Sequence, residues 1–71
     1  MTQSLAEIIQ GKWQQLAGLA HIVWDDLTLD ELVKSKGDAK KLTLLVQQRY
    51  EMTHNEAERQ VISFFERNRT T

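Results

Sequence analysis

The residues that could do chemistry in this 71-residue chain are two histidines, its carboxylates and its serines, since it has no cysteine. His21 and Asp25 stand four residues apart. On a helix this spacing would present two ligands to one metal ion. No third and fourth ligand are evident nearby, and a solvated pair is the simpler interpretation. The sequence therefore predicts no metal site and no bound cofactor.

The remaining polar residues suggest no catalytic centre. His54 falls in the first turn of a predicted helix, where the helix dipole disfavours the imidazolium form. Three serines lack a histidine at a suggestive distance, although folding could still bring one near: Ser4, Ser35 and Ser63. Glu56 and Glu58 resemble paired carboxylates, but Glu56 is expected to cap a helix. We therefore expect that the protein is not an enzyme.

One local concentration of charge surrounds Gly37. Four lysines flank this turn: Lys34, Lys36, Lys40 and Lys41. Free backbone N–H groups at a helix start can receive a phosphate, so a weak nucleic-acid or phosphate-binding module is the alternative hypothesis. Against it, Asp38 lies in the turn, the net charge is −1, and no aromatic residue interleaves the lysines to stack a base. A solvated loop is the simpler interpretation.

A stripe of large apolar residues must position these groups. Trp13, Leu16, Ala20 and Trp24 follow one another at helical steps of three or four residues, so they share one helix face. Indole rings carry a large apolar surface, and we expect the core to form against this stripe. A capping box at Ser4 predicts one long first helix ending near residue 25. Its two glycines, at positions 11 and 18, are expected to let a neighbouring helix approach closely.

Three further helices are predicted downstream. Thr28 opens a short second helix, and Gly37 supplies the left-handed residue that ends it. Asp38 caps a third helix that stops around residues 51–52, and Thr53 caps a fourth. The chain contains no proline and no alternating strand pattern, so the predicted fold class is all-α. The predicted core comprises Trp13, Leu16, Ala20, Trp24, Leu42, Val46, Tyr50, Ala57, Val61 and Phe64.

Composition places the chain among small globular proteins. It is 41% hydrophobic and 27% charged, which predicts one domain over residues 1–71 with a frayed tail at 67–71. A net charge of −1 gives no general attraction to nucleic acid or anionic lipid. No stretch is long and apolar enough to predict a membrane span or a signal peptide. Together with the lack of cysteine, this predicts a cytoplasmic protein.

A spaced pattern covers most of the chain, roughly residues 11–64. It comprises Gly11-x-Trp13-x-Gln15-Leu16-x-Gly18, Trp24, Leu27-Thr28-x-Asp30-Glu31, Gly37, Leu42, Gln47-x-Arg49-Tyr50 and Glu56-Ala57-Glu58-x-Gln60-Val61. This pattern resembles the CsbD-like family of small bacterial stress-response proteins. The resemblance implies a four-helix bundle of two packed α-hairpins and a link to the general stress response. It implies no known catalytic activity and no cofactor, because the molecular function of that family is unsettled.

Departures from the family pattern suggest an interaction surface. Leu19 and Ile22 stand where the family has charged residues, and Leu44 replaces a customary glycine. Asp25 and Glu51 also stand at usual glycine positions near helix ends. The three apolar residues lie away from the predicted core faces, which predicts a patch for an unknown protein partner or a second copy. Alternatively, they complete the core. The predicted function is a non-enzymatic, stress-associated helical protein acting through protein contacts or self-association.

Overall fold

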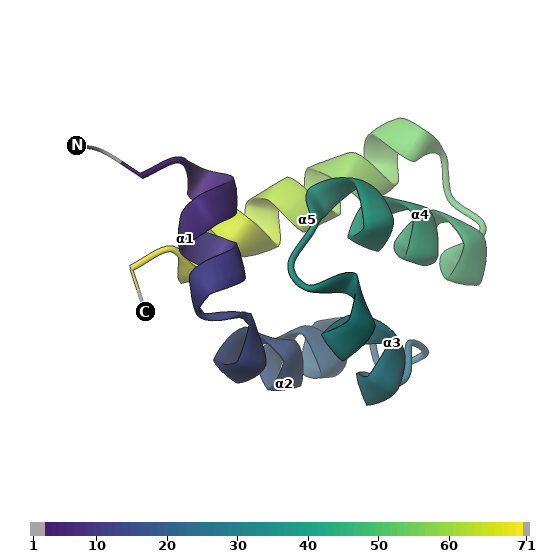
Figure 1. The fold of residues 1–71 in the computed structure, drawn as a ribbon. Helices are drawn as coiled ribbons and strands as arrows, with labels where there is room; N and C mark the ends of the chain where they lie inside the picture. The colour runs from purple at the N-terminus through teal and green to yellow at the C-terminus, as the bar shows by residue number, and fades with distance from the viewer. Residues whose placement is uncertain (1–2, 71) are drawn as a thin grey trace.

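The computed structural model describes residues 3–70, and they form five α-helices and no β-strand (Figure 1). The helices are α1 (Leu5–Gly11), α2 (Trp13–Val23), α3 (Leu29–Ser35), α4 (Ala39–Tyr50) and α5 (His54–Asn68). The predicted all-α class is therefore confirmed for the described residues. Of the predicted tail at 67–71, Arg67 and Asn68 belong to α5, and Thr71 lies outside the described residues.

The prediction of one long first helix is wrong, because the chain breaks at Lys12. The backbone of Lys12 has φ −120° and ψ 22°, and its N–H bonds to the carbonyls of Gln10 and Ile9 instead of continuing a regular helix. Gly11, a weak helix former, precedes the break. The break turns α1 away from the direction of α2 (Figure 1). As a result Ile9 is buried with α1 against α5, while Trp13 is buried where α2 meets α3.

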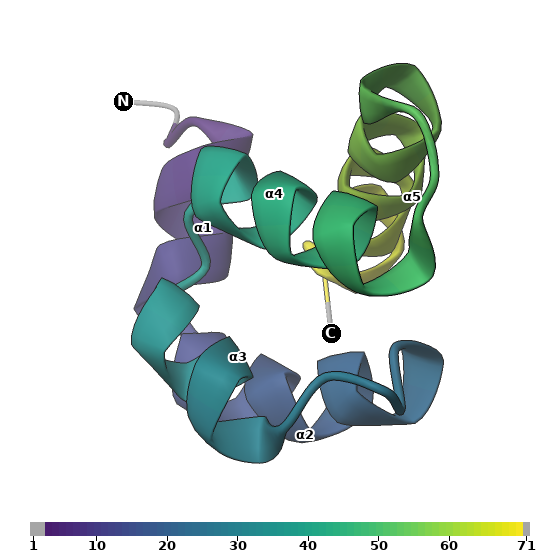
Figure 2. The same ribbon diagram turned by 90° about the vertical axis from the view of Figure 1, so that its right-hand side faces the viewer.

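The helices pack chiefly in two sequential pairs. Helix α2 lies on α3, and α4 lies on α5. Figure 2 shows the α2–α3 pair below and the α4–α5 pair above, with α1 at one side. Helix α1 contacts both α2 and α5. The pairs are those expected of two α-hairpins. The predicted four-helix bundle is not confirmed, because residues 3–70 form five helices with α1 separate.

The core forms where the pairs meet. Every residue of the predicted core is buried except Tyr50, which is half-buried because its hydroxyl bonds to a surface loop. Five further apolar residues are buried in the core: Ile9, Ala17, Leu27, Leu32 and Phe65. The Trp24 ring lies 5.2 Å from the Phe64 ring, and the Trp13 ring meets Phe65 edge-on at 6.3 Å. The two tryptophans therefore join the first half of the chain to α5, as their aromatic surface favours.

The predicted left-handed conformation of Gly37 is confirmed, whereas the expectation for Gly11 and Gly18 is not. Gly37 has φ +74°, and a Cβ atom there would lie 3.2 Å and 3.3 Å from two atoms of the Trp13 ring. Both its backbone conformation and its packing therefore favour glycine. At Gly11 and Gly18 an added Cβ would meet nothing within 4 Å. The expectation that these two glycines admit a neighbouring helix of the same chain is wrong.

Four predicted N-caps are present. Ser4, Thr28, Asp38 and Thr53 each accept a backbone N–H of the helix that follows. Helix α4 ends at Glu51, which adopts a left-handed conformation with φ 51°. Glycine most often adopts this conformation at the end of a helix, but the residue here is a glutamate.

Candidate functional site

His21 and Asp25, whose spacing suggested at most a weak metal pair, do not share one helix. Helix α2 ends at Val23, so Asp25 does not follow His21 on a continuous helix. His21 is half-buried and Asp25 is exposed. Among residues 3–70, no group of three or more histidine, aspartate or glutamate side chains could hold a metal ion.

His54 lies among exposed side chains on α5. Its Nδ1 is 3.3 Å from Oε1 of Gln47, and its Nε2 is 3.7 Å from Oε2 of Glu58, one turn along the helix. Glu56 donates its backbone N–H to the Thr53 hydroxyl. The Glu58 carboxylate thus lies beside His54, and the Glu56 backbone helps to cap α5.

The three serines are also separate from the histidines in their contacts. Ser35 is buried and donates its hydroxyl hydrogen to the Leu32 carbonyl at 2.6 Å. Ser4 caps α1 through the backbone N–H of Glu7, and Ser63 is exposed on α5. Ser4 and Ser35 therefore form hydrogen bonds within their own helix segments.

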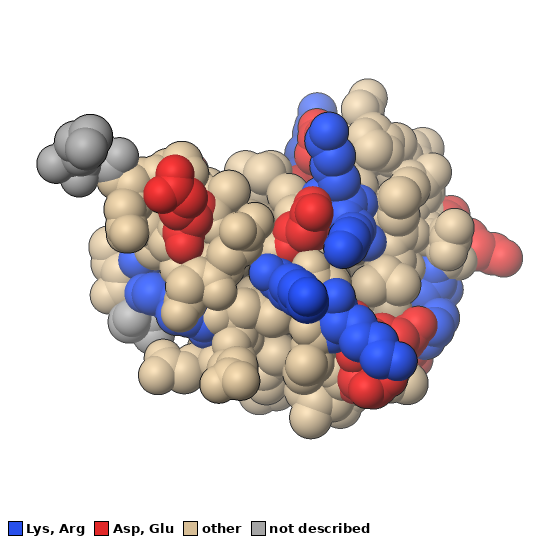
Figure 3. All heavy atoms as spheres, in the orientation of Figure 1, with Lys and Arg blue, Asp and Glu red and all other residues tan. Residues whose placement is uncertain are grey.

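The lysine-rich turn already holds a carboxylate at the helix start. Oδ1 of Asp38 accepts the backbone N–H groups of Lys40 and Lys41 at 2.9 Å and 3.5 Å. This carboxylate occupies the position that a bound phosphate would use. Lys34 pairs with Asp30 at 3.1 Å, with both side chains largely exposed. On the face shown in Figure 3, lysine and arginine side chains gather toward the middle, and acidic side chains lie among and beside them.

A hollow lies at the break between α1 and α2. It has a volume of about 700 Å³, and its lining includes Lys12, Trp13, Val33 and Lys36 together with three glutamines. The Lys12 ammonium donates to the Arg69 carbonyl at 3.2 Å. No histidine or carboxylate side chain lines this hollow. Its polar side chains are the two lysine ammonium groups and the three glutamine amides.

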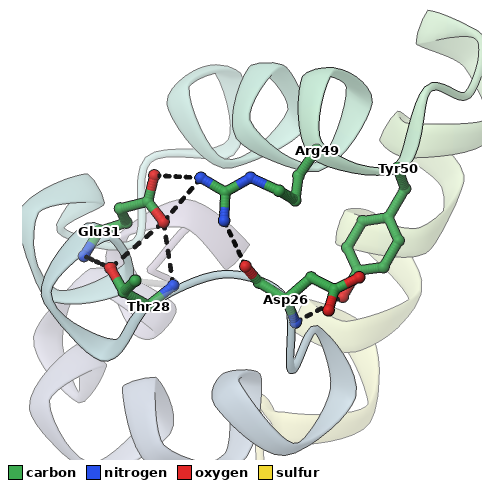
Figure 4. Close-up of polar contacts among 5 residues, drawn as sticks. All are labelled: Asp26, Thr28, Glu31, Arg49 and Tyr50. Atoms are coloured by element: carbon green, nitrogen blue, oxygen red, sulfur yellow. Dashed lines mark hydrogen bonds and ion pairs between the residues drawn. The ribbon is translucent and has the colours of Figure 1, made fainter.

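Sequence reasoning missed a polar cluster made by Asp26, Thr28, Glu31, Arg49 and Tyr50, here called the Arg49 cluster (Figure 4). The guanidinium of Arg49 donates to both carboxylate oxygens of Glu31, at 3.0 Å and 2.8 Å, and also to the Asp26 carbonyl. The Asp26 backbone N–H donates to the Tyr50 hydroxyl at 3.0 Å. The end of α4 is thereby tied to α3 and to the loop before it.

Glu31 serves two partners at once. Its carboxylate accepts the backbone N–H of Thr28 at 2.9 Å, completing a capping box, and it also pairs with Arg49. The Thr28 N–H and then the Arg49 charge lower the pKa of Glu31 below its ordinary value, while desolvation acts in the opposite direction. The carboxylate is therefore ionised near neutral pH and is fully engaged in holding helices together.

Both indole N–H groups also join helices. Nε1 of Trp13 donates to the Leu32 carbonyl on α3 at 2.6 Å, and Nε1 of Trp24 donates to Oε1 of Gln60 on α5 at 3.0 Å. The available signal for these contacts was the family pattern, which includes Gln60, Arg49 and the tryptophans. The residues that carry the resemblance are thus largely those that connect one helix to another.

The predicted apolar patch divides into two surfaces. Leu19 and Ile22 are 41% and 75% exposed, and with Val23 they line a groove of about 270 Å³ between α2 and the end of α5. Leu44 is 53% exposed but lines two other hollows on α4, one of them shared with Ile62 of α5. The three predicted residues therefore line no common groove. The surface formed by Leu19, Ile22 and Val23 is here called the α2 face.

Comparison with known proteins identifies close relatives. The chain is 47% identical over 62 residues to a UPF0337 protein of Bordetella pertussis, covering 87% of this chain and 94% of that protein. It is 39% identical over 62 residues to a UPF0337 protein of Pseudomonas aeruginosa, covering 87% and 95%. A UPF0337 protein of Xanthomonas axonopodis pv. citri is 39% identical over 59 residues, covering 83% and 86%.

Two other comparisons gave no match. No model of a known protein family matches the chain, and no solved structure is significantly similar to it. Within the part of the chain that the structure describes, no helix has the length and apolar character needed to cross a membrane.

Proposed function

The chain belongs to the UPF0337 family, and we propose that it is a non-enzymatic, stress-associated helical protein that acts through protein–protein contacts. The stress association follows from the resemblance of its spaced pattern to the CsbD-like proteins. The names of its relatives state no activity. A cytoplasmic location is part of the same proposal, and the lack of cysteine fits a reducing compartment.

The proposed absence of catalysis is supported by the roles of the polar side chains. Arg49 and Glu31 hold α3 to α4, and the two indole N–H groups hold α2 to α3 and to α5. A catalytic group needs a free acid, base or nucleophile aimed at a substrate position. These groups are instead engaged with one another or with the backbone.

The exposure of the α2 face is the single observation that carries the contact proposal. Ile22 is 75% exposed, although burying an isoleucine side chain contributes about 1.5–3 kcal/mol. Leu19 and Val23 extend the same surface to the groove beside α5. A partner covering this face would remove apolar area from water that the monomer leaves exposed.

The α2 face can be tested in the host cell. We expect replacement of the native gene by Ile22→Glu to reduce survival after heat and salt stress to that of the deletion strain. Leu44→Glu is the matched control, because it adds the same charge on a different exposed surface and should retain wild-type survival. Circular dichroism of both purified variants checks that they fold. Wild-type survival of Ile22→Glu cells would contradict the contact proposal, and an unaffected deletion strain would contradict the stress association.

The alternative of a phosphate-binding or nucleic-acid-binding module receives no comparable support. Asp38 already accepts the backbone N–H groups at the start of α4, and Lys34 pairs with Asp30. A filter-binding titration at low salt provides the test, because binding through lysines must weaken steeply as salt is added.

A further inference from the structure

We propose that the partner of the α2 face is a second copy of this chain, with two α2 helices packed antiparallel and the Ile22 of each lying over the Gly18 of the other. This inference rests on the proposed function and specifies its partner. It joins three observations: an unexplained glycine, an exposed isoleucine one turn away, and a helix surface without charge.

Gly18 has no evident role within the monomer. A glycine inside a helix is destabilising relative to alanine. An added Cβ at Gly18 would meet nothing within 4 Å, and its backbone does not have the positive φ that requires glycine at position 37. The missing side chain therefore only opens space on the outer surface of α2. A helix approaching from outside the chain would use that space.

Gly18 and Ile22 form a complementary pair on one helix face. They lie four residues apart on α2, on the side facing away from Trp13, Leu16 and Ala20, which are buried. Ile22 protrudes, while Gly18 leaves a notch one turn earlier. In an antiparallel two-fold arrangement each protrusion meets the notch of the other copy. A parallel two-fold arrangement would instead place Ile22 against Ile22 and the two notches together.

Charge favours the same occupant and the same direction. The exposed residues of α2 on and beside this face carry no formal charge: Gln14, Gln15, Gly18, Leu19, Ile22 and Val23. Arg67 of α5 lines the groove next to them. Lys12 lies at one end of α2, and Asp25 follows the other end, so antiparallel packing brings unlike ends together. The net charge of −1 leaves little repulsion between two copies. A single helix face is small against the 800 Å² or so per partner of stable complexes, so the dimer should be weak.

Sedimentation velocity from about 10 μM to about 1 mM tests the proposal in a range where weak association is measurable. We expect the wild-type chain to form a dimer reversibly. Gly18→Ala should raise the midpoint of thermal unfolding measured at low concentration, yet weaken dimerisation by about tenfold or more. Ile22→Glu should abolish dimerisation, and Leu44→Glu should leave it unchanged. Chemical-shift changes with concentration should be confined to residues 11–25 and the end of α5.

If Gly18→Ala stabilises the monomer but weakens dimerisation, the result supports packing of a second copy at Gly18. A wild-type chain that stays monomeric at 1 mM would overturn the inference, as would Gly18→Ala dimerising as strongly as wild type. If the wild type is monomeric while Ile22→Glu still impairs survival under stress, the partner is another protein and the proposed function stands. If Ile22→Glu does not impair survival, the proposed function fails even where a dimer forms.

Discussion

Substitution of Gly37 by alanine should destabilise the fold by about 2–5 kcal/mol. The left-handed conformation at φ +74° costs an alanine about 1–2 kcal/mol. The new Cβ would also lie 3.2 Å from the Trp13 ring, which is held by its N–H bond to the Leu32 carbonyl. Relieving such a contact in a packed core typically costs a further 1–3 kcal/mol.

This loss is a large part of what so short a chain can have. At about 0.05–0.15 kcal/mol per residue, the whole protein should have a free energy of unfolding of roughly 4–11 kcal/mol. Urea unfolding followed by tryptophan fluorescence measures the difference directly, and an unchanged slope would show that the denatured state is unaffected.

Two control variants separate the causes. Gly37→Asn tolerates the left-handed conformation but still places a Cβ against the Trp13 ring, so it should remain destabilising. Gly11→Ala adds a Cβ into open space and should not destabilise the chain. If Gly37→Ala unfolded within about 0.5 kcal/mol of the wild type, the assignment of Gly37 to close packing against Trp13 would be refuted.

Three further predictions concern the core, the Arg49 cluster and a helix end. Trp24→Ala should cost about 3–5 kcal/mol and leave little folded protein by far-ultraviolet circular dichroism, whereas a wild-type spectrum would contradict its place in the core. Because the folded state lowers the pKa of Glu31, its contribution to stability should be present above the unfolded pKa of about 4.5 and be lost as the pH falls through the lower folded value. Urea midpoints of the wild type and Glu31→Gln should therefore converge in acid. A difference that stays constant down to acid pH would contradict the stabilising role of the ionised Glu31 carboxylate. Glu51→Gly should raise the free energy of unfolding by up to about 1 kcal/mol, because Glu51 has a left-handed backbone; a decrease would contradict this.

The helices were predictable because their starts carry local signals. Ser4, Thr28, Asp38 and Thr53 each bond within three residues along the chain, so the sequence alone indicates them. Helix α2 has no such signal, since Lys12 makes no side-chain cap. The helical spacing of apolar residues also continues across the break. Helix α1 contacts α5, far along the chain, and local spacing rules do not reach such a contact.

The candidate surface was only partly predictable for a related reason. Helical periodicity indicates which side of a helix faces away from its own core stripe, and Ile22 is indeed exposed. It does not indicate how one hairpin sits on another, which decides whether Leu44 lies near Leu19. Arg49 and Glu31 are likewise joined across 18 residues of sequence, beyond the reach of any local spacing rule.

The packing of α1 and of both tryptophans against α5 has a consequence for biosynthesis. Trp24 lacks its Gln60 partner and Ile9 lacks its cover until the last helix has left the ribosome. If α2 pairs with α3 during translation, the aromatic surface of the tryptophans stays in water. Most of the stabilising contacts can therefore form only after α5 has been synthesised. We therefore expect nascent chains arrested before residue 54 to remain susceptible to protease, and the released protein to fold in one cooperative step.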